Sequence, residues 1–186
     1  MDQINNQAQC HLNLLSELHT IFTSVQANFW LRGGWAIDFL LGRVTRTHSD
    51  IDLVTWVNHR IPLESALVEA GYKKQPVSEL QTDFFKNDVD VSIVYLTRAS
   101  DGRILANGIT DWEWRSDALP TKLYTLNGIG SYVLSPQQLL EEKQVYENGT
   151  GRKPRQKDIE SMRIIQSIIE NLKTSQAETK EPDQKV

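Results

Sequence analysis

Two short motifs lie close together in the chain and combine residue types that bind phosphate and divalent metal. The first is the glycine pair Gly33-Gly34, and the second is Asp50-Ile51-Asp52. Glycine lets the backbone turn sharply, and free N–H groups at the start of a following helix bind phosphate. Two neighbouring carboxylates repel each other, and such oxygen ligands favour Mg²⁺, which takes further ligands from substrate phosphates. The spacing therefore predicts a phosphate site beside a magnesium site.

A third carboxylate, Asp90, lies in the alternating segment from Asp88 to Tyr95. The alternation predicts a strand with its apolar residues on one face and its polar residues on the other. Asp90 stands between two valines, where burying an unpaired carboxylate costs several kcal/mol. We therefore expect Asp90 to have a partner such as a metal ion or a proton-donating substrate. Asp88 follows Asn87 and is interpreted as a turn residue.

The elements that position these motifs follow from the spacing of apolar residues. Phe29 to Leu31 predicts a short strand that breaks at the glycine pair, and Trp35 to Leu41 predicts a helix. A polar connection, Arg43 to Ser49, leads into a second strand, Asp50 to Val54, which has both carboxylates on one face. The predicted unit is a strand, a tight turn, a helix and a strand, and it sets the two motifs one connection apart.

The rest of the chain predicts further helices and strands around this unit. An amphipathic helix is expected from Ile4 to Gln26, with His11 and His19 as surface or cap residues. Helices are also expected to open at Pro62, at Pro136 with Ser135 as N-cap, and at Asp158. Strands are expected at Tyr72–Pro76, around Phe84–Lys86, at Arg103–Ala106, at Leu123–Leu126 and at Ser131–Leu134.

Composition limits the classes of function. The chain has 186 residues, with 20 Lys plus Arg against 24 Asp plus Glu and a net charge of −4. This balance argues against a nucleic-acid partner held by charge alone. Cys10 is the only cysteine, which fits a reducing compartment. The sequence shows neither a signal segment nor a long apolar run, so we expect a cytoplasmic protein with no membrane partner.

The string GGWAIDFLLGRVTRTHSDIDL resembles the bacterial antibiotic nucleotidyltransferases of the polymerase-beta-like superfamily, and within them the small aminoglycoside and lincosamide enzymes. The resemblance implies an α+β fold, the minimal nucleotidyltransferase fold, with a short mixed sheet flanked by helices and with C-terminal helices. The implied organisation is a nucleotidyltransferase core at 1–134 and a helical segment packed on it at 135–173. The tail, 174–186, lacks apolar residues and is expected to be disordered.

The same resemblance implies an activity and a set of site residues. The activity is Mg²⁺-dependent transfer of a nucleoside monophosphate, with ATP as the expected donor, to a hydroxyl group. Two Mg²⁺ ions would be held by Asp50, Asp52 and Asp90, and Asp90 is also the candidate general base. Gly33 and Gly34 are expected to hold the β- and γ-phosphates.

Several basic residues are further candidates for contacting the triphosphate. Arg46 and His48 precede the second strand and either contact phosphate or orient that strand. Lys143 either neutralises the triphosphate or pairs with nearby glutamates. The basic loop 152–157 either neutralises the triphosphate or is a solvated loop that leads into the last helix. His48 is not expected to bind the metal, because the resemblance implies a site made of carboxylates only.

The expected acceptor is a small cationic antibiotic, but its class is open. The string through Leu53 looks more like the aminoglycoside enzymes, whereas the segment from Asp90 to Ile104 looks more like the lincosamide enzymes. Val77 to Asp117 holds eight acidic against four basic residues, which favours a cationic acceptor and hence an aminoglycoside. Trp112 and Trp114 are either an aromatic wall for this ligand or partly buried core residues.

Two other functions remain open from the sequence. One is a nucleotidyltransferase of the antitoxin type, which modifies a protein or an RNA. The other is a nucleotide-binding module without turnover, which the presence of all three carboxylates disfavours. The sequence is compatible with a monomer or a homodimer.

Overall fold

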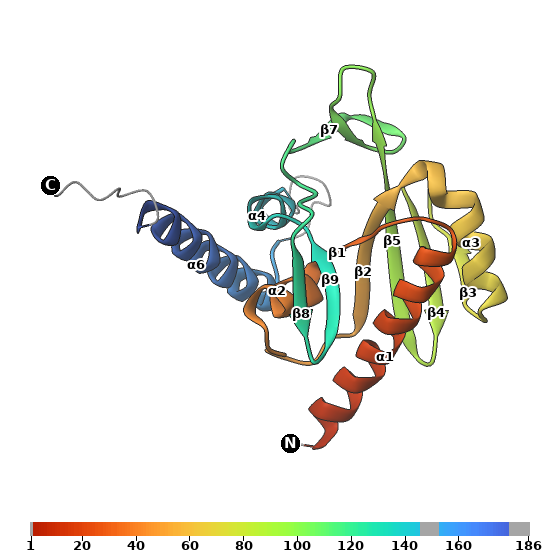
Figure 1. Cartoon of the computed structure of the whole chain (residues 1–186), viewed down its shortest axis with the longest axis horizontal. Helices are drawn as coiled ribbons and strands as arrows, with labels where there is room; N and C mark the ends of the chain where they lie inside the picture. Colours follow the sequence, from red (N-terminus) through yellow and green to blue (C-terminus); the bar gives the residue numbers. More distant parts are fainter. Residues whose placement is uncertain (1, 146–152, 179–186) are drawn as a thin grey trace, which may run out of the picture. The chain divides into compact units, whose positions relative to one another are not determined.

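The computed structural model describes residues 2–145 and 153–178. The chain divides into two compact units, Met1–Leu134 and Ser135–Val186. The described part of the first unit is built on a mixed β-sheet with helices, and that of the second consists of two helices (Figure 1). The predicted α+β class is confirmed.

The elements of the first unit follow the predicted order, with shifted ends. Its helices are α1 (Asp2–Ser24), α2 (Gly33–Leu41), the 3₁₀ turn η1 (Val57–His59) and α3 (Arg60–Glu69). Its strands are β1 (Trp30–Arg32), β2 (Asp50–Trp56), β3 (Lys73–Pro76), β4 (Gln81–Lys86), β5 (Val89–Arg98), β6 (Ile104–Ala106), β7 (Ile109–Trp114), β8 (Leu123–Leu126) and β9 (Ile129–Val133). The sequence-based expectations include no strand at β7, whose one partner among the described strands is β6.

The order of strands in the sheet is β3-β4-β5-β2-β1-β9-β8, with β6 and β7 attached to β5. β2 runs parallel to β5 and antiparallel to β1, and β1 runs parallel to β9. The two strands that carry the predicted carboxylates are therefore direct neighbours in the centre of the sheet. β1, which leads into α2, lies on the other side of β2.

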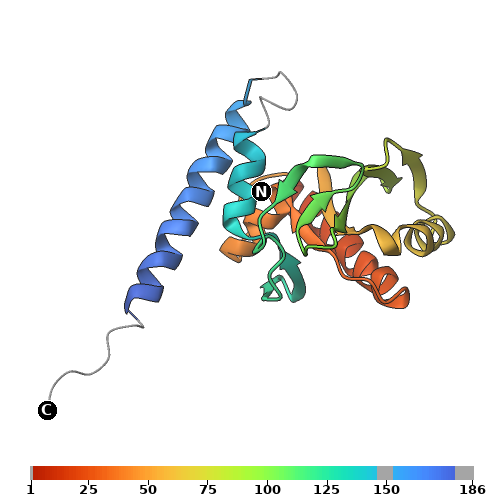
Figure 2. The same cartoon turned by 90° about the horizontal axis from the view of Figure 1, so that it is seen from above.

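The central strands bury one face against helices. Ile51 and Leu53 of β2 are fully buried, as are Val91 and Ile93 of β5. α1 and α3 lie side by side on this face (Figures 1 and 2). Successive side chains of a strand point to opposite faces, so the even-numbered residues of β2 and β5 point away from these two helices.

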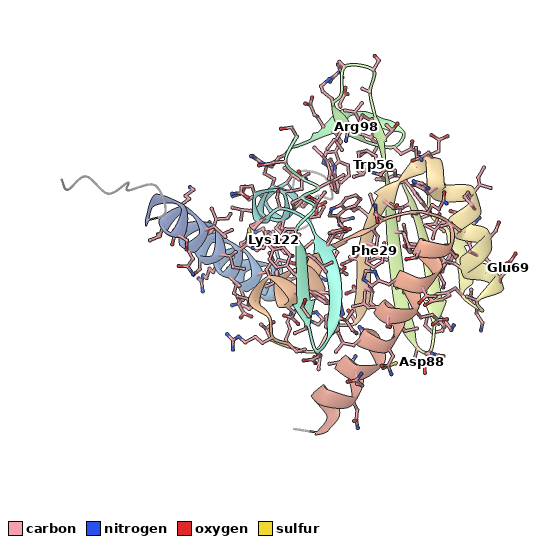
Figure 3. The ribbon with its side chains drawn as sticks, viewed as in Figure 1. Phe29, Trp56, Glu69, Asp88, Arg98 and Lys122 are labelled. Atoms are coloured by element: carbon pink, nitrogen blue, oxygen red, sulfur yellow. The ribbon has the colours of Figure 1, made fainter. Side chains whose placement is uncertain are left out.

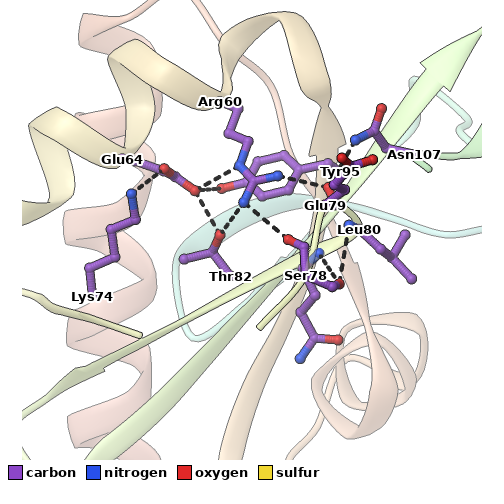
Figure 4. A network of polar contacts seen from close by, with 10 residues as sticks. Arg60, Glu64, Lys74, Ser78, Glu79, Leu80, Thr82, Tyr95 and Asn107 are labelled. Carbon is purple, nitrogen blue, oxygen red and sulfur yellow. Dashed lines mark hydrogen bonds and ion pairs between the residues drawn. The ribbon is translucent and has the colours of Figure 1, made fainter. Parts of the chain in front are cut away.

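A buried carboxylate, Glu64, ties α3 to three strands (Figure 4). It accepts hydrogen bonds from Arg60 Nε at 3.0 Å, from Thr82 Oγ1 at 2.7 Å and from the Tyr95 hydroxyl at 3.1 Å. Lys74 Nζ lies 2.6 Å from its other oxygen. Burial alone would raise the pKa of Glu64, but hydrogen bonds from Lys74, Thr82 and Arg60 outweigh it and lower the pKa to about 2.

This network makes stability depend on pH. Because the pKa of Glu64 is depressed in the folded state, its contribution is present above its ordinary value of 4.5 and is lost as pH falls toward 2. The contribution amounts to about 3 kcal/mol of unfolding free energy at pH 7. We expect Glu64→Gln to be less stable at pH 7 and to lose less stability than the wild type between pH 6 and pH 3. Urea unfolding across that range measures both; equal pH slopes for the two proteins would contradict the assignment.

The second unit contains α4 (Pro136–Gln144) and α6 (Gln156–Glu178), which contact each other. Ser135 Oγ accepts a hydrogen bond from the Gln138 backbone N–H at 3.3 Å, which confirms the predicted N-cap. Residues 174–178 belong to α6, so the expected start of a disordered tail at residue 174 is wrong. The backbone bonds of a helix form within the segment itself, and they require no apolar side chains. Residues 179–186 lie outside the described residues.

In the described ranges, no helix is both long enough and apolar enough to cross a membrane.

Candidate active site

The register between β2 and β5 gathers three acidic residues on one face of the sheet. Asp50 lies directly opposite Asp90, and Asp52 lies opposite Ser92. Neighbouring strands are about 5 Å apart, and residues two positions apart on a strand are about 7 Å apart. The three carboxylates therefore start from the corners of a small triangle. Asp50 and Asp90 are exposed and Asp52 is half-buried, so the face that they share is open.

The site lies near one end of the sheet. Asn87 and Asp88 form the turn that joins β4 to β5, and both have a positive φ, 51° and 60°. This confirms the interpretation of Asp88 as a turn residue, since two successive positive φ values are typical of a tight hairpin turn. Figure 3 shows Asp88 at one end of β5 and Arg98 at the other. Asp90 is two residues from the turn.

The donor set fits a metal that is shared with a substrate. Within the described ranges, no three histidine, cysteine or acidic side chains converge into a ready-made metal cage. Asp50, Asp52 and Asp90 instead offer only oxygen atoms on an open face, and their like charges repel one another. Mg²⁺ suits this arrangement, because it keeps several waters and completes its shell with phosphate oxygens rather than with protein alone.

Gly33 packs directly against one of these carboxylates. It is the first residue of α2 and has φ +65°, and a Cβ added to it would overlap Oδ2 of Asp52. Arg32 precedes it as the N-cap residue and makes no side-chain cap bond; it lies opposite Asp52 in the sheet. The first N–H groups of a helix lack intrahelical partners, so this end of α2 can donate to phosphate oxygens next to the carboxylates.

Arg46 and His48 lie beside the second glycine. A Cβ added to Gly34 would overlap His48 Nδ1 and would lie 2.6 Å from His48 Cε1 and 2.7 Å from Arg46 Nη2. The Arg46 guanidinium also donates to the Thr47 carbonyl at 2.9 Å. We refer to Gly33, Gly34 and Arg46 as the phosphate cradle. The fold brings these three predicted phosphate-binding residues together beside Asp52.

Asp38 is a buried carboxylate that sequence reasoning missed. It lies on α2 with no exposed surface, and its Oδ2 is 2.6 Å from Nε2 of His48, which is 3% exposed. The other oxygen of Asp38, Oδ1, accepts hydrogen bonds from the backbone N–H and the hydroxyl of Thr45. The available signal was a lone acidic residue among the apolar residues of the predicted helix, WAIDFLL.

His11 also belongs to the interior, so the expectation of a surface or cap role is wrong. It is 2% exposed, and its Nδ1 accepts a hydrogen bond from Trp35 Nε1 at 3.1 Å. Burial lowers the pKa of His11, His48 lowers it further, and the charge of Asp50 opposes both. Trp35 in turn packs against the His48 ring, with ring centroids 4.6 Å apart. The helical spacing of α1 places His11 on its buried side, next to the apolar Leu12 and Leu15.

On the side away from β1 and Gly33, the strand next to the carboxylates is β4. Asp83 lies opposite Ser92, and Phe85 lies opposite Asp90 with 39% of its surface exposed. Paired residues point to the same face, so Asp83 is a fourth carboxylate on the face of the site. It accepts a hydrogen bond from Gln81 Nε2 at 2.7 Å. Sequence reasoning missed Asp83, because its neighbour on the open face comes from another strand.

Lys143 belongs to the second unit, where it has a local partner. Its Nζ lies 3.2 Å from Oδ1 of Asp158, and Arg155 Nε donates to the other oxygen at 2.8 Å. Burial alone would raise the pKa of Asp158, but the two cations outweigh it and lower the pKa to about 2. Contact of Lys143 or of the loop 152–157 with a triphosphate stays a prediction; Arg152 lies outside the described residues.

Trp114 does not offer a ring face to a ligand. It is 2% exposed, whereas Trp112 is half-buried. Both lie on β7, which reaches the sheet through β6, and β6 pairs with β5 at Leu96, six residues beyond Asp90. At 3.3 Å a residue this point is about 20 Å along the strand from Asp90. Of the two interpretations of the tryptophans, the structure favours that of partly buried core residues.

Comparison with known proteins identifies similar families. A family model described as aminoglycoside-2''-adenylyltransferase matches residues 14–165. A 2''-aminoglycoside nucleotidyltransferase of Escherichia coli is 60% identical over 40 residues, which are 22% of this chain and 22% of that protein. A lincosamide resistance protein of Staphylococcus haemolyticus is 36% identical over 53 residues, 28% of this chain and 33% of that protein. These alignments thus span a third or less of the curated relatives.

A solved structure shows that the similarity of fold extends over most of the chain. The crystal structure of ANT(2'')-Ia in complex with adenylyl-2''-tobramycin superposes with a TM-score of 0.73 at 22% identity. The match covers 86% of this chain and 90% of that one. The predicted nucleotidyltransferase fold is therefore confirmed.

Proposed function

Because this chain belongs to the aminoglycoside-2''-adenylyltransferase family, we propose that it transfers AMP from ATP to a hydroxyl group of an aminoglycoside antibiotic and so confers resistance. The observation that carries the proposal is the register that sets Asp50 opposite Asp90, with Asp52 packed on Gly33 beside them. This arrangement puts metal-binding oxygens and phosphate-binding N–H groups on adjoining parts of one open face. The reaction consumes ATP, so we place it in the cytoplasm.

The phosphate cradle binds the donor. The N–H groups at the start of α2 donate hydrogen bonds to oxygens of the β- and γ-phosphates, and Arg46 neutralises part of the phosphate charge. Asp50, Asp52 and Asp90 would hold two Mg²⁺ ions, which when bound polarise the acceptor hydroxyl and stabilise the charge of the leaving pyrophosphate.

Asp90 is proposed as the general base. It is exposed on the flank of the carboxylate cluster that faces β4, away from the phosphate cradle. The acceptor oxygen attacks the α-phosphorus, its proton passes to the Asp90 carboxylate, and the bond from the α-phosphorus to the bridging oxygen breaks. Pyrophosphate leaves with the electron pair of that bond. Holding the two substrates in this geometry supplies much of the rate, because a bimolecular step becomes effectively unimolecular.

The acceptor is proposed to lie over β4 and β5. The donor occupies the β1 and β2 side, so the acceptor reaches Asp90 from the side of Asp83 and Phe85. A half-buried carboxylate beside an exposed ring suits an amino sugar, whose ammonium group pairs with Asp83 while a sugar face packs on Phe85. This favours a polycationic aminoglycoside over a lincosamide.

We expect Asp83→Asn to raise KM for an aminoglycoside about tenfold, since a hydrogen bond to a charged group contributes about 1.5 kcal/mol or more. KM for ATP should change less than twofold, because Asp83 lies on the flank away from the cradle. Steady-state kinetics with each substrate varied in turn measures this. The matched control is Asp111→Asn, an exposed carboxylate of β7 in the same acidic stretch of sequence. Equal effects of the two variants would show that only overall charge matters.

The proposed function is tested by incubating the protein with Mg²⁺, labelled ATP and panels of aminoglycosides and lincosamides. A labelled aminoglycoside and released pyrophosphate are expected. Transfer to a lincosamide hydroxyl is the second candidate, and the similarity to the lincosamide resistance protein supports it. Label on protein or RNA, or nucleotide binding without pyrophosphate release, would replace the proposal by a modifying enzyme of the antitoxin type or by a binding module.

A further inference from the structure

We infer that Asp38 is a positioning residue of the proposed reaction, which acts through His48 to hold the phosphate cradle against the metal-binding strand. The inference rests on the proposed function and extends it to a residue that touches neither substrate. The carboxylate of Asp38 and the side chains of Thr45 and His48 form what we call the connection clamp, because they fasten the segment between α2 and β2 to α2.

The Asp38 carboxylate holds the connection at two points. It receives the backbone N–H of Thr45 at 3.2 Å, the Thr45 hydroxyl at 2.5 Å and His48 Nε2 at 2.6 Å. The carboxylate has no exposed surface, and a buried carboxylate that lost these donors would be left without compensation for its lost hydration. The connection therefore has one strongly preferred arrangement relative to α2.

The His48 ring links the Asp38 carboxylate to the phosphate cradle. A carboxylate only accepts hydrogen bonds, so Nε2 donates to Asp38 and Nδ1 faces Gly34. The ring is also packed on Trp35, and the His48 carbonyl accepts from Gln7 Nε2 at 2.9 Å. His48 thus contacts α1 and α2 at once, and its position is set from several sides.

The clamp connects the two halves of the proposed site. His48 stands two residues before Asp50, and its ring fills the space beside Gly34 together with the Arg46 guanidinium. Gly33, next in the chain to Gly34, packs on Asp52. If the clamp is broken, Arg46 and the start of α2 lose their fixed position relative to β2. The acceptor side on β4 and β5 shares none of these contacts.

The test measures binding of a non-hydrolysable ATP analogue with Mg²⁺ by calorimetry, and steady-state kinetics where transfer is observed. We expect Asp38→Asn to weaken analogue binding about tenfold and to lower kcat/KM for ATP by up to about a hundredfold, as outer-shell substitutions do. KM for the acceptor should stay within twofold. An asparagine N–H facing Nε2 would make Nε2 an acceptor, so ¹⁵N NMR of the imidazole should show the proton moved to Nδ1.

Two further variants keep the test independent of folding defects. His48→Gln retains an N–H donor toward Asp38 and should retain most of the analogue affinity, whereas His48→Leu should lose it. Glu64→Gln is the matched control, because it also disrupts a buried carboxylate with several donors on a helix, but none of its donors Arg60, Lys74, Thr82 and Tyr95 belongs to the phosphate cradle. It should lower the unfolding temperature and leave analogue affinity unchanged.

The possible failures are distinguishable. If Asp38→Asn and Glu64→Gln lower stability alike and both bind the analogue as the wild type does, Asp38 is structural only and the inference fails. An equal rise in KM for ATP and for the acceptor would overturn it as well. If the wild-type protein binds no analogue, the proposed function fails and the inference fails with it.

Discussion

Replacing Asp50 or Asp52 with asparagine is expected to reduce AMP transfer about a thousandfold or more without unfolding the protein. An amide is a weaker metal ligand than a carboxylate and carries no charge, and metal ions supply several kcal/mol of stabilisation to the charge that develops in phosphoryl transfer. Because the carboxylates repel one another, removing one charge should leave the unfolding temperature unchanged or raised. Initial rates at saturating Mg²⁺ and thermal unfolding measure the two effects.

Asp88→Asn is the matched control for these variants. Asp88 is exposed in the turn two residues before Asp90 and has φ 60°, a conformation that asparagine tolerates well. It changes the local charge by the same amount without touching the carboxylate cluster, so its rate should stay within about twofold of the wild type. Near-normal turnover in Asp50→Asn or Asp52→Asn would refute the assignment of the metal ligands.

Gly33→Ala is expected to lower kcat/KM for ATP about a hundredfold. The substitution forces a side chain into a left-handed conformation, φ +65°, and its Cβ would overlap Oδ2 of Asp52. The backbone strain alone destabilises the fold by about 1–2 kcal/mol. The overlap displaces the Asp52 carboxylate from its proposed metal-binding position, and a displacement of about 1 Å at a reacting centre can lower the rate about a hundredfold.

Gly42→Ala distinguishes the effect of backbone strain from the effect of displacing the Asp52 carboxylate. Gly42 ends the same helix with φ +66°, and among the described residues no atom other than those of its neighbours in the chain lies within 4 Å of an added Cβ. The two alanine variants should therefore lose similar amounts of stability in urea unfolding, while only Gly33→Ala loses activity. Comparable activity in both variants would show that Asp52 does not depend on the glycine beside it.

Local spacing was enough to predict the turn at Gly33-Gly34 and the strand that carries Asp50 and Asp52. The strand, the helix that begins at Gly33 and the carboxylates on one face of β2 depend on residues close together in the chain. Backbone geometry fixes which of these side chains share a face. The shifted ends of α2 and α3, which begin at Gly33 and Arg60, reflect termini that local patterns define poorly.

Side-chain contacts between different helices and strands could not be predicted from local spacing. Lys143 was expected either at the triphosphate or beside glutamates of its own helix, and it pairs with Asp158 of α6. His11 looked like a surface residue and is buried against Trp35. In each case the partner comes from another element, and sequence periodicity shows only that a side chain is on an inner or outer face.

By itself the sequence determined the chemistry that the site can offer: the glycine turn, the Asp50 and Asp52 pair, and a third carboxylate on an alternating strand. The tertiary structure decided which strands are neighbours, and so set Asp90 opposite Asp50, added Asp83 to their face and joined Asp38 to His48. Strand register is fixed by hydrogen bonds and apolar packing between segments far apart in the chain, and those contacts exist only once the sheet has formed.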